Sequence, residues 1–186
     1  VMVVEVMGRH TGWIALHSGV SATADVILIP EIPYDLDKVC EKIEERYAPG
    51  GPRFAIVVAA EGAAPLGGEQ VYVESAGPGR AARLGGIAER LARQIAERTG
   101  RETRSLVLGH LQRGGSPTAY DRLIALRFGA AAVRCVAEGH FGTMVALDPP
   151  DIRAVPLEEA VREIKRVPVD SDTVQTARDL GISFGD

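Results

Sequence analysis

The stretch VMVVEVMGR, residues 1–9, opens the chain with an apolar run that ends in glycine and arginine. Such a run is typical of a strand buried on both faces in the middle of a parallel sheet, with a neighbouring strand on each side. It has neither an initiator methionine nor the charged-then-apolar pattern of a signal peptide, so we expect the chain to be a piece of a longer protein. The stretch therefore predicts an α/β fold.

The composition is that of a globular protein. The chain has 186 residues, of which 46% are hydrophobic and 25% charged, enough to bury one core. Cys40 and Cys135 fall in segments expected to be helical and form no disulfide or zinc framework, which predicts a cytoplasmic location. The net charge of −4 argues against nucleic acid as a partner. No apolar run approaches the roughly 18 residues that span a bilayer, which argues against a membrane.

Strand-like and helix-like segments alternate along the chain, as they do in βαβ units. Strands are expected at 1–6, 25–29, 54–60, 105–108 and 144–147, and helices at 12–20, 35–48, 84–100, about 117–139 and 157–165. Asp35 is expected to cap one helix and Gly100 to end another. Residues 62–80 are rich in glycine, alanine and proline, and EQVYVES within them, residues 69–75, forms either a short hairpin arm or an ordered loop. The pattern of 167–186 predicts no particular structure.

Polar side chains follow three of the predicted strands, where ligands gather in open α/β sheets. The stretches are MGRHTG after the first strand, EG after the third and GHLQRGG after the fourth. They place six polar side chains at one rim: Arg9, His10, Glu61, His110, Gln112 and Arg113. Arginine binds phosphate in a bidentate manner, while histidine and carboxylate hydrogen-bond to hydroxyl groups. The set therefore predicts a site for a phosphorylated polyol.

The stretch GGSPTAYDR adds a helix start close to this rim. Ser116 is expected to be its N-cap and Pro117 its first residue, so that the positive end of the helix faces the same region. Taken singly, an arginine here is explained by a surface ion pair, Glu61 by a turn and His110 by a structural hydrogen bond. Their coincidence at successive strand ends favours a site.

Four stretches resemble the carboxyl-terminal half of the 6-phosphofructokinases, from residue 1 to at least residue 148. They are VVEVMGRHTGWIAL, VILIPE, VVAAEGA and TGRETRSLVLGHLQRGGSPTAYDR. The resemblance implies an α/β fold with a Rossmann-like, three-layer parallel sheet, which is the fructose 6-phosphate-binding half of a two-domain enzyme. It implies a substrate-binding domain at 1–111, a segment at 112–162 that returns to the phosphoryl-donor domain, and a tail at 163–186.

The resemblance also implies roles for individual residues. Met7, Gly8 and Arg9 would line the fructose 6-phosphate pocket, and Arg9 would stabilise the transferring phosphoryl group. Glu61 would accept from sugar hydroxyls. The substrate would further be held by His110, Leu111, Gln112 and Arg113, with His110 or Arg113 near its 6-phosphate. Arg104, at the start of its strand, would reach the substrate of a neighbouring subunit in a homotetramer or homodimer.

Several elements of the family lie outside these residues. The glycine-rich donor loop, the GGD element and the TIDND segment with the general-base aspartate would precede Val1. The Mg²⁺ that assists transfer would bind with them, so no metal or cofactor ligands are expected in this chain, and the chain alone is expected to be inactive and incompletely folded. The stretch 62–86 resembles the longer branch of the family, which leaves the donor open between ATP and pyrophosphate.

Regulation and the exact class of function are separate questions. Allosteric members of the family that the chain resembles carry several lysines before the strand that ends in the substrate glutamate, whereas Arg53 is the one cation in YAPGGPRFAIVV. An effector site that involves Asp25 and Arg53 would therefore bind a phosphate effector weakly, and we expect a non-allosteric or differently regulated enzyme. The main prediction is transfer of a phosphoryl group to the 1-hydroxyl of fructose 6-phosphate, giving fructose 1,6-bisphosphate in glycolysis. The alternative is a non-catalytic subunit that binds a phosphosugar or nucleotide for assembly or regulation.

Overall fold

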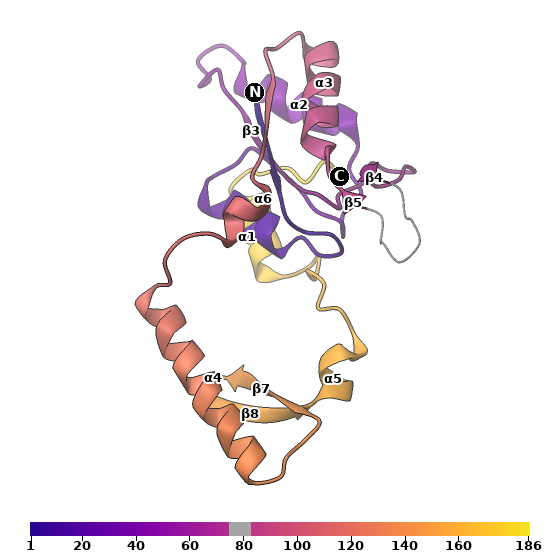
Figure 1. Cartoon of the computed structure of the whole chain (residues 1–186). Coiled ribbons are helices and arrows are strands. Elements are labelled where there is room, and N and C mark those ends of the chain that lie inside the picture. Colours follow the sequence, from indigo (N-terminus) through magenta and orange to yellow (C-terminus); the bar gives the residue numbers. More distant parts are fainter. Residues whose placement is uncertain (75–82) are drawn as a thin grey trace. The chain divides into compact units, whose positions relative to one another are not determined.

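The computed structural model describes residues 1–74 and 83–186 (Figure 1). The chain divides into two compact units. Unit 1 comprises Val1–Gln112 together with Lys165–Asp186, and unit 2 comprises Arg113–Ile164. Within the described residues, no helix is both long and apolar enough to cross a membrane.

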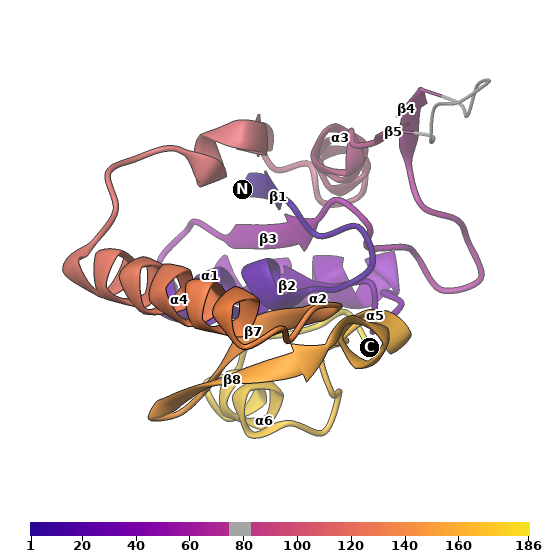
Figure 2. The same cartoon turned by 60° about the horizontal axis from the view of Figure 1, so that its bottom comes forward.

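Unit 1 is built on a four-stranded parallel sheet with the strand order β2-β3-β1-β6. Its strands are β1 (Met2–Val6), β2 (Val26–Leu28), β3 (Ile56–Ala60) and β6 (Arg104–Val107). The sheet confirms the expected parallel α/β fold, and β1 has a neighbour on each side as the opening run predicts. Figures 1 and 2 show β1 and β3 side by side.

Helices cover both faces of this sheet. They are α1 (Trp13–Ser21), α2 (Leu36–Arg46), α3 (Ile87–Thr99) and α6 (Asp172–Asp179). The Asp35 carboxylate accepts a hydrogen bond from the Asp37 backbone N–H at 2.8 Å, which confirms it as the cap of α2. Gly100 ends α3 with φ at 67°, in the left-handed region where glycine is favoured.

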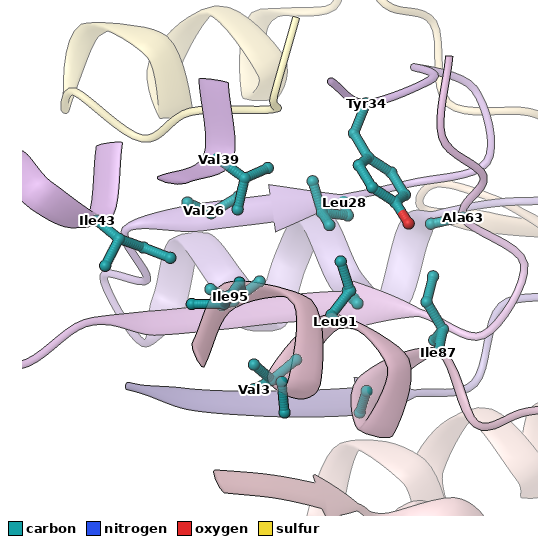
Figure 3. Packing of buried hydrophobic residues seen from close by; sticks show 14 of the residues in the cluster. Val3, Val26, Leu28, Tyr34, Val39, Ile43, Ala63, Ile87, Leu91 and Ile95 are labelled. Carbon is teal, nitrogen blue, oxygen red and sulfur yellow. The ribbon is translucent and has the colours of Figure 1, made fainter. Parts of the chain in front are cut away.

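The side chains of each strand alternate between the two faces of the sheet and so divide the core into two clusters. Val3 and Val57 face the side covered by α2 and α3, where Leu91 and Ile95 pack (Figure 3). On the opposite side, Val58 packs in a cluster that includes residues of α1 and α6. Successive residues of a strand point to opposite faces, so a run that is apolar throughout supplies both clusters. The result is the expected three-layer arrangement.

The segment between β3 and α3 contains a short hairpin. Antiparallel pairing joins β4 (Tyr72–Glu74) to β5 (Arg83–Leu84), which selects the hairpin arm over the loop for the described end of EQVYVES. Figure 2 shows this hairpin beside α3, which begins shortly after β5. The prediction that Leu84 belongs to the helix is wrong, because Gly85 and Gly86 both have positive φ and separate β5 from α3. Residues 75–80 of the predicted segment lie outside the described residues.

The last residues of the chain pack on unit 1. Ser183 forms a parallel bridge with Val26, and Phe184 is fully buried. The Glu31 carboxylate accepts hydrogen bonds from the backbone N–H groups of Gly12 and Val167, at 3.0 and 2.9 Å, and so joins the start of α1 to the tail. The apolar residues from 165 onward follow no regular spacing, so this packing could not be predicted from the sequence.

Unit 2 contains two helices and a hairpin. Its elements are α4 (Ala119–Ala137), β7 (Thr143–Asp148), β8 (Asp151–Pro156) and α5 (Leu157–Arg162), with β7 and β8 paired antiparallel. The prediction that Ser116 caps α4 and Pro117 begins it is wrong. Thr118 is the cap, because its hydroxyl and the Asp121 carboxylate accept hydrogen bonds from each other's backbone N–H groups in a capping box.

Candidate functional site

The parallel register brings three loops to one edge of the sheet in unit 1. Val6 lies opposite Ala60, and Glu5 lies opposite Val107, so β1, β3 and β6 end close to the same level. The backbone N–H of Glu61 donates to the Val6 carbonyl at 2.9 Å. The stretches MGRHTG, EG and GHLQR therefore leave the sheet together, as the sequence predicts.

Side-chain hydrogen bonds connect these loops. The backbone N–H of Gly8 donates to Glu61 Oε1 at 3.3 Å, which joins the loop after β1 to the turn after β3. The backbone N–H of Met7 donates to Gln112 Oε1 at 3.2 Å, and Gln112 Nε2 donates to the Gly109 carbonyl at 2.9 Å. Gln112 thus joins β1 to the 3₁₀ helix η1 (Gly109–Arg113) through its amide.

Close backbone packing explains the glycine after Glu61. A Cβ atom on Gly62 would lie 2.1 Å from the Arg9 carbonyl oxygen and 2.7 Å from that of Gly8. The backbone N–H of Gly62 also donates to the Gly8 carbonyl at 3.0 Å. Only glycine allows the two loops to approach this closely.

A pocket of about 440 Å³ opens at this edge of unit 1. It is lined by Glu5, Met7, Glu61, Leu84, Gly85, Gly86, Glu89, Val107, Gly109 and His110. The pocket thus brings together three of the predicted site residues, Met7, Glu61 and His110, from three different strand ends. It offers carboxylates and an imidazole, which are groups that hydrogen-bond to the hydroxyls of a sugar.

Two carboxylates in the pocket, those of Glu5 and Glu89, are not among the predicted site residues. Glu5 is 4% exposed, and its Oε2 accepts a hydrogen bond at 3.1 Å from the backbone N–H of Ala88, in the first turn of α3. A carboxylate is stabilised there by the positive end of the helix. A charged residue inside the apolar run of β1 was the available signal for Glu5, whereas nothing in the sequence marked Glu89.

The other predicted residues do not line the pocket. Arg9 is half-buried in the loop after β1, and His10 beside it is exposed. Leu111 is 78% exposed in η1, and Arg113 is the first residue of unit 2. Gly8 contributes its backbone N–H to Glu61.

Arg104 lies at the other edge of the sheet, at the amino end of β6. Its side chain is 74% exposed and pairs with Glu102, with Nη2 and Oε1 2.7 Å apart. It lines a separate pocket of about 550 Å³ that also contains Arg53 and Arg101. The expectation that Arg104 stands at the far end of its strand is confirmed, while its action on a neighbouring subunit stays a prediction.

Asp25 has structural partners for both of its oxygens. It is 7% exposed, with Oδ1 2.6 Å from Arg46 Nε, and Oδ2 accepts from the backbone N–H of Ile56 at 2.8 Å. These contacts hold α2 and β3 to β2. Asp25 therefore has a structural role, and its part in an effector site with the exposed Arg53 stays a prediction.

The described part of the chain lacks a cluster of metal ligands. Among residues 1–74 and 83–186, no group of three or more His, Cys, Asp and Glu side chains could hold a metal ion. These residues therefore do not fit Mg²⁺ on their own.

Comparisons with known proteins agree on one family. A family model described as phosphofructokinase matches residues 1–136. The ATP-dependent 6-phosphofructokinase of Chloroflexus aggregans is 54% identical over 186 residues, which cover 100% of this chain and 50% of that protein. The pyrophosphate–fructose 6-phosphate 1-phosphotransferase of Amycolatopsis methanolica is 55% identical over 173 residues, covering 90% of this chain and 49% of that protein.

Solved structures give the same result. The pyrophosphate-dependent phosphofructokinase of Marinobacter aquaeolei matches with a TM-score of 0.72 and 27% identity, over 97% of this chain and 46% of that one. The phosphofructokinase of Saccharomyces cerevisiae matches with a TM-score of 0.70 and 32% identity, over 96% of this chain and 21% of that one. The chain spans about half the length of the relatives it matches by sequence.

Proposed function

The chain belongs to the phosphofructokinase family, and from this premise we propose that it forms the fructose 6-phosphate-binding part of a 6-phosphofructokinase. The complete enzyme would transfer a phosphoryl group to the 1-hydroxyl and yield fructose 1,6-bisphosphate in glycolysis. The observation that carries the proposal is the pocket in which Met7, Glu61 and His110 meet at the carboxyl edge of the parallel sheet. A ligand at this edge is the general expectation for open α/β sheets.

The side chains have distinct tasks in this proposal. Glu61 orients the sugar by accepting hydrogen bonds from its hydroxyls, while its Oε1 also holds the backbone N–H of Gly8. His110 donates to the substrate from η1, which follows β6. Arg9 neutralises charge on the transferring phosphoryl group, and Arg113 binds the 6-phosphate through its planar guanidinium. Catalysis of this kind consists of positioning and charge stabilisation.

The phosphoryl donor and its metal belong to the part of the enzyme that this chain does not include. Relatives of both donor types share more than half of their aligned residues with the chain, so ATP and pyrophosphate are both retained. We propose that Mg²⁺ binds with the donor, outside the residues described here. A cytoplasmic location belongs to the same proposal.

An oligomer in which Arg104 serves a neighbouring subunit completes the proposal. Its exposed guanidinium at the amino edge of the sheet supports this assignment. The test is complementation in the complete open reading frame: Arg9→Ala and Arg104→Ala are each expected to be inactive, and their mixture to regain activity after subunit exchange. One site of a mixed oligomer then contains both arginines. A mixture that stays inactive, although mixed oligomers form, argues against a shared site.

The main experiment measures phosphorylation of fructose 6-phosphate by the complete open reading frame, with ATP and with pyrophosphate. Glu61→Gln keeps an acceptor for Gly8 but removes the charge, and we expect KM for fructose 6-phosphate to rise about tenfold or more. Glu69→Gln, an exposed neighbour, is the matched control and should leave KM unchanged. If neither ATP nor pyrophosphate yields product, the proposal is overturned.

The alternative of a non-catalytic binding subunit is not favoured. The relatives that cover the whole chain at 54% identity are named as ATP-dependent 6-phosphofructokinases. A binding subunit would show fructose 6-phosphate affinity without turnover of either donor, so the same assay separates the two functions.

A further inference from the structure

Gln70, which lies just before β4, contacts both of the loops that frame the pocket. Its Nε2 donates to the Gly62 carbonyl at 2.8 Å and to the Arg9 carbonyl at 3.2 Å. The first carbonyl belongs to the turn after β3, and the second belongs to the loop after β1. One amide group therefore spans the two segments that carry Glu61 and Arg9.

The two carbonyl groups need such a donor. Both belong to tightly packed backbone, because Gly62 has no room for a Cβ atom beside the Arg9 carbonyl. Two carbonyl oxygens directed at the same place repel each other unless a donor lies between them. An amide NH₂ group has two hydrogens, one for each carbonyl, and so matches the site in number.

Tyr72 fixes the orientation of this amide. Its hydroxyl lies 3.1 Å from Gln70 Oε1, to which it donates. With the oxygen end of the amide held in this way, the NH₂ end is directed at the two carbonyls. Tyr72 is 49% exposed, so its ring adds little to the core. We therefore expect the Tyr72 hydroxyl to act mainly through its hydrogen bond to Gln70.

We propose that Gln70, oriented by Tyr72, is a positioning residue that holds the Arg9 loop against the Glu61 turn for binding and phosphorylation of fructose 6-phosphate. The inference rests on the proposed function, and it adds a residue from the hairpin segment to the site. Gln70 acts through the backbone of Arg9 and Gly62 and does not itself line the pocket. Without the two hydrogen bonds of Gln70, the loops stay joined through Gly8, which contacts Gly62 and Glu61. The Arg9 carbonyl, however, loses its contact with Gln70, and Arg9 shifts relative to Glu61.

The test uses four variants in the complete open reading frame. Gln70→Glu is nearly isosteric but has no donor, and its charge faces two carbonyl oxygens. Gln70→Lys is the rescuing variant, because its ammonium group donates again. Tyr72→Phe removes the orienting hydroxyl alone, and Glu69→Gln is the matched control at an exposed neighbouring position.

We expect Gln70→Glu to raise KM for fructose 6-phosphate about five- to twentyfold, with KM for the donor unchanged. Gln70→Lys should recover most of this loss, Tyr72→Phe should raise KM about two- to fourfold, and the control should match wild type. A lower thermal midpoint with an unchanged KM for fructose 6-phosphate would mean a merely structural role and would overturn the inference. If the wild type is active and the Gln70 variants keep its KM for fructose 6-phosphate, only the inference about Gln70 is overturned. If the wild type is inactive, the proposed function is overturned.

Discussion

Replacing Gly62 with alanine should push the turn after β3 away from the loop after β1. The added Cβ atom would lie 2.1 Å from the Arg9 carbonyl oxygen, where 3.4 Å or more is ordinary contact, so the backbones must move apart by more than an ångström. Misplacement on this scale costs on the order of 100-fold in rate when it affects catalytic groups. Overpacking of this kind also destabilises a protein by about 1–3 kcal/mol.

The assay compares kcat/KM for fructose 6-phosphate and the thermal unfolding midpoint of Gly62→Ala in the complete open reading frame. Gly129→Ala is the matched control, since Gly129 lies in α4 and a Cβ atom there meets nothing within 4 Å. The control should keep wild-type kinetics and gain up to about 1 kcal/mol of stability from helix propensity. If Gly62→Ala keeps wild-type kcat/KM, the reasoning about close packing of the two loops is refuted.

Three further predictions concern stability. Leu91→Ala should lower the free energy of unfolding by about 2–5 kcal/mol in denaturant titrations, because Leu91 is fully buried between α3 and the sheet. The Arg178 guanidinium lowers the pKa of Asp186 through a hydrogen bond. The pair therefore stabilises the fold at pH values above the usual carboxyl pKa, and this stability is lost as the pH falls through the lowered pKa. Asp186→Asn should make the thermal midpoint fall less steeply on acidification. Thr118→Ala should cost about 0.5–2 kcal/mol and speed hydrogen exchange in the first turn of α4, where an unchanged rate would argue against the capping box.

The sequence predicts unit 1 well where one physical signal dominates. Strands that are apolar on both faces have few alternatives to a parallel sheet, and Asp35 and Gly100 mark helix ends through backbone chemistry. Prediction fails where two signals compete. Ser116 and Pro117 have the composition of a helix start, but the reciprocal bonds of Thr118 and Asp121 satisfy more backbone groups.

Elements that depend on distant contacts were hidden from local reasoning. The strand β8 follows two prolines and is mixed in polarity, so its partner β7 decides its structure. Glu5 and Glu89 lie in one pocket only because α3 begins at the carboxyl edge of β1. Gln70 is comparable, since no local pattern shows that its amide meets two carbonyls from other loops.

The two edges of the sheet limit which residues of one chain can meet. Arg104 begins β6 and His110 follows the end of the same strand, so the strand alone separates them by about 10 Å at 3.3 Å per residue. Residues at opposite ends of a parallel strand face different edges, and the pocket with His110 lies at the carboxyl edge while Arg104 lines the pocket at the amino edge. Within one chain, Arg104 and His110 therefore line different pockets. If both bind fructose 6-phosphate, as proposed, an Arg104 from a second copy of the chain is the simpler arrangement, and the polarity of the sheet thus supports the proposed oligomer.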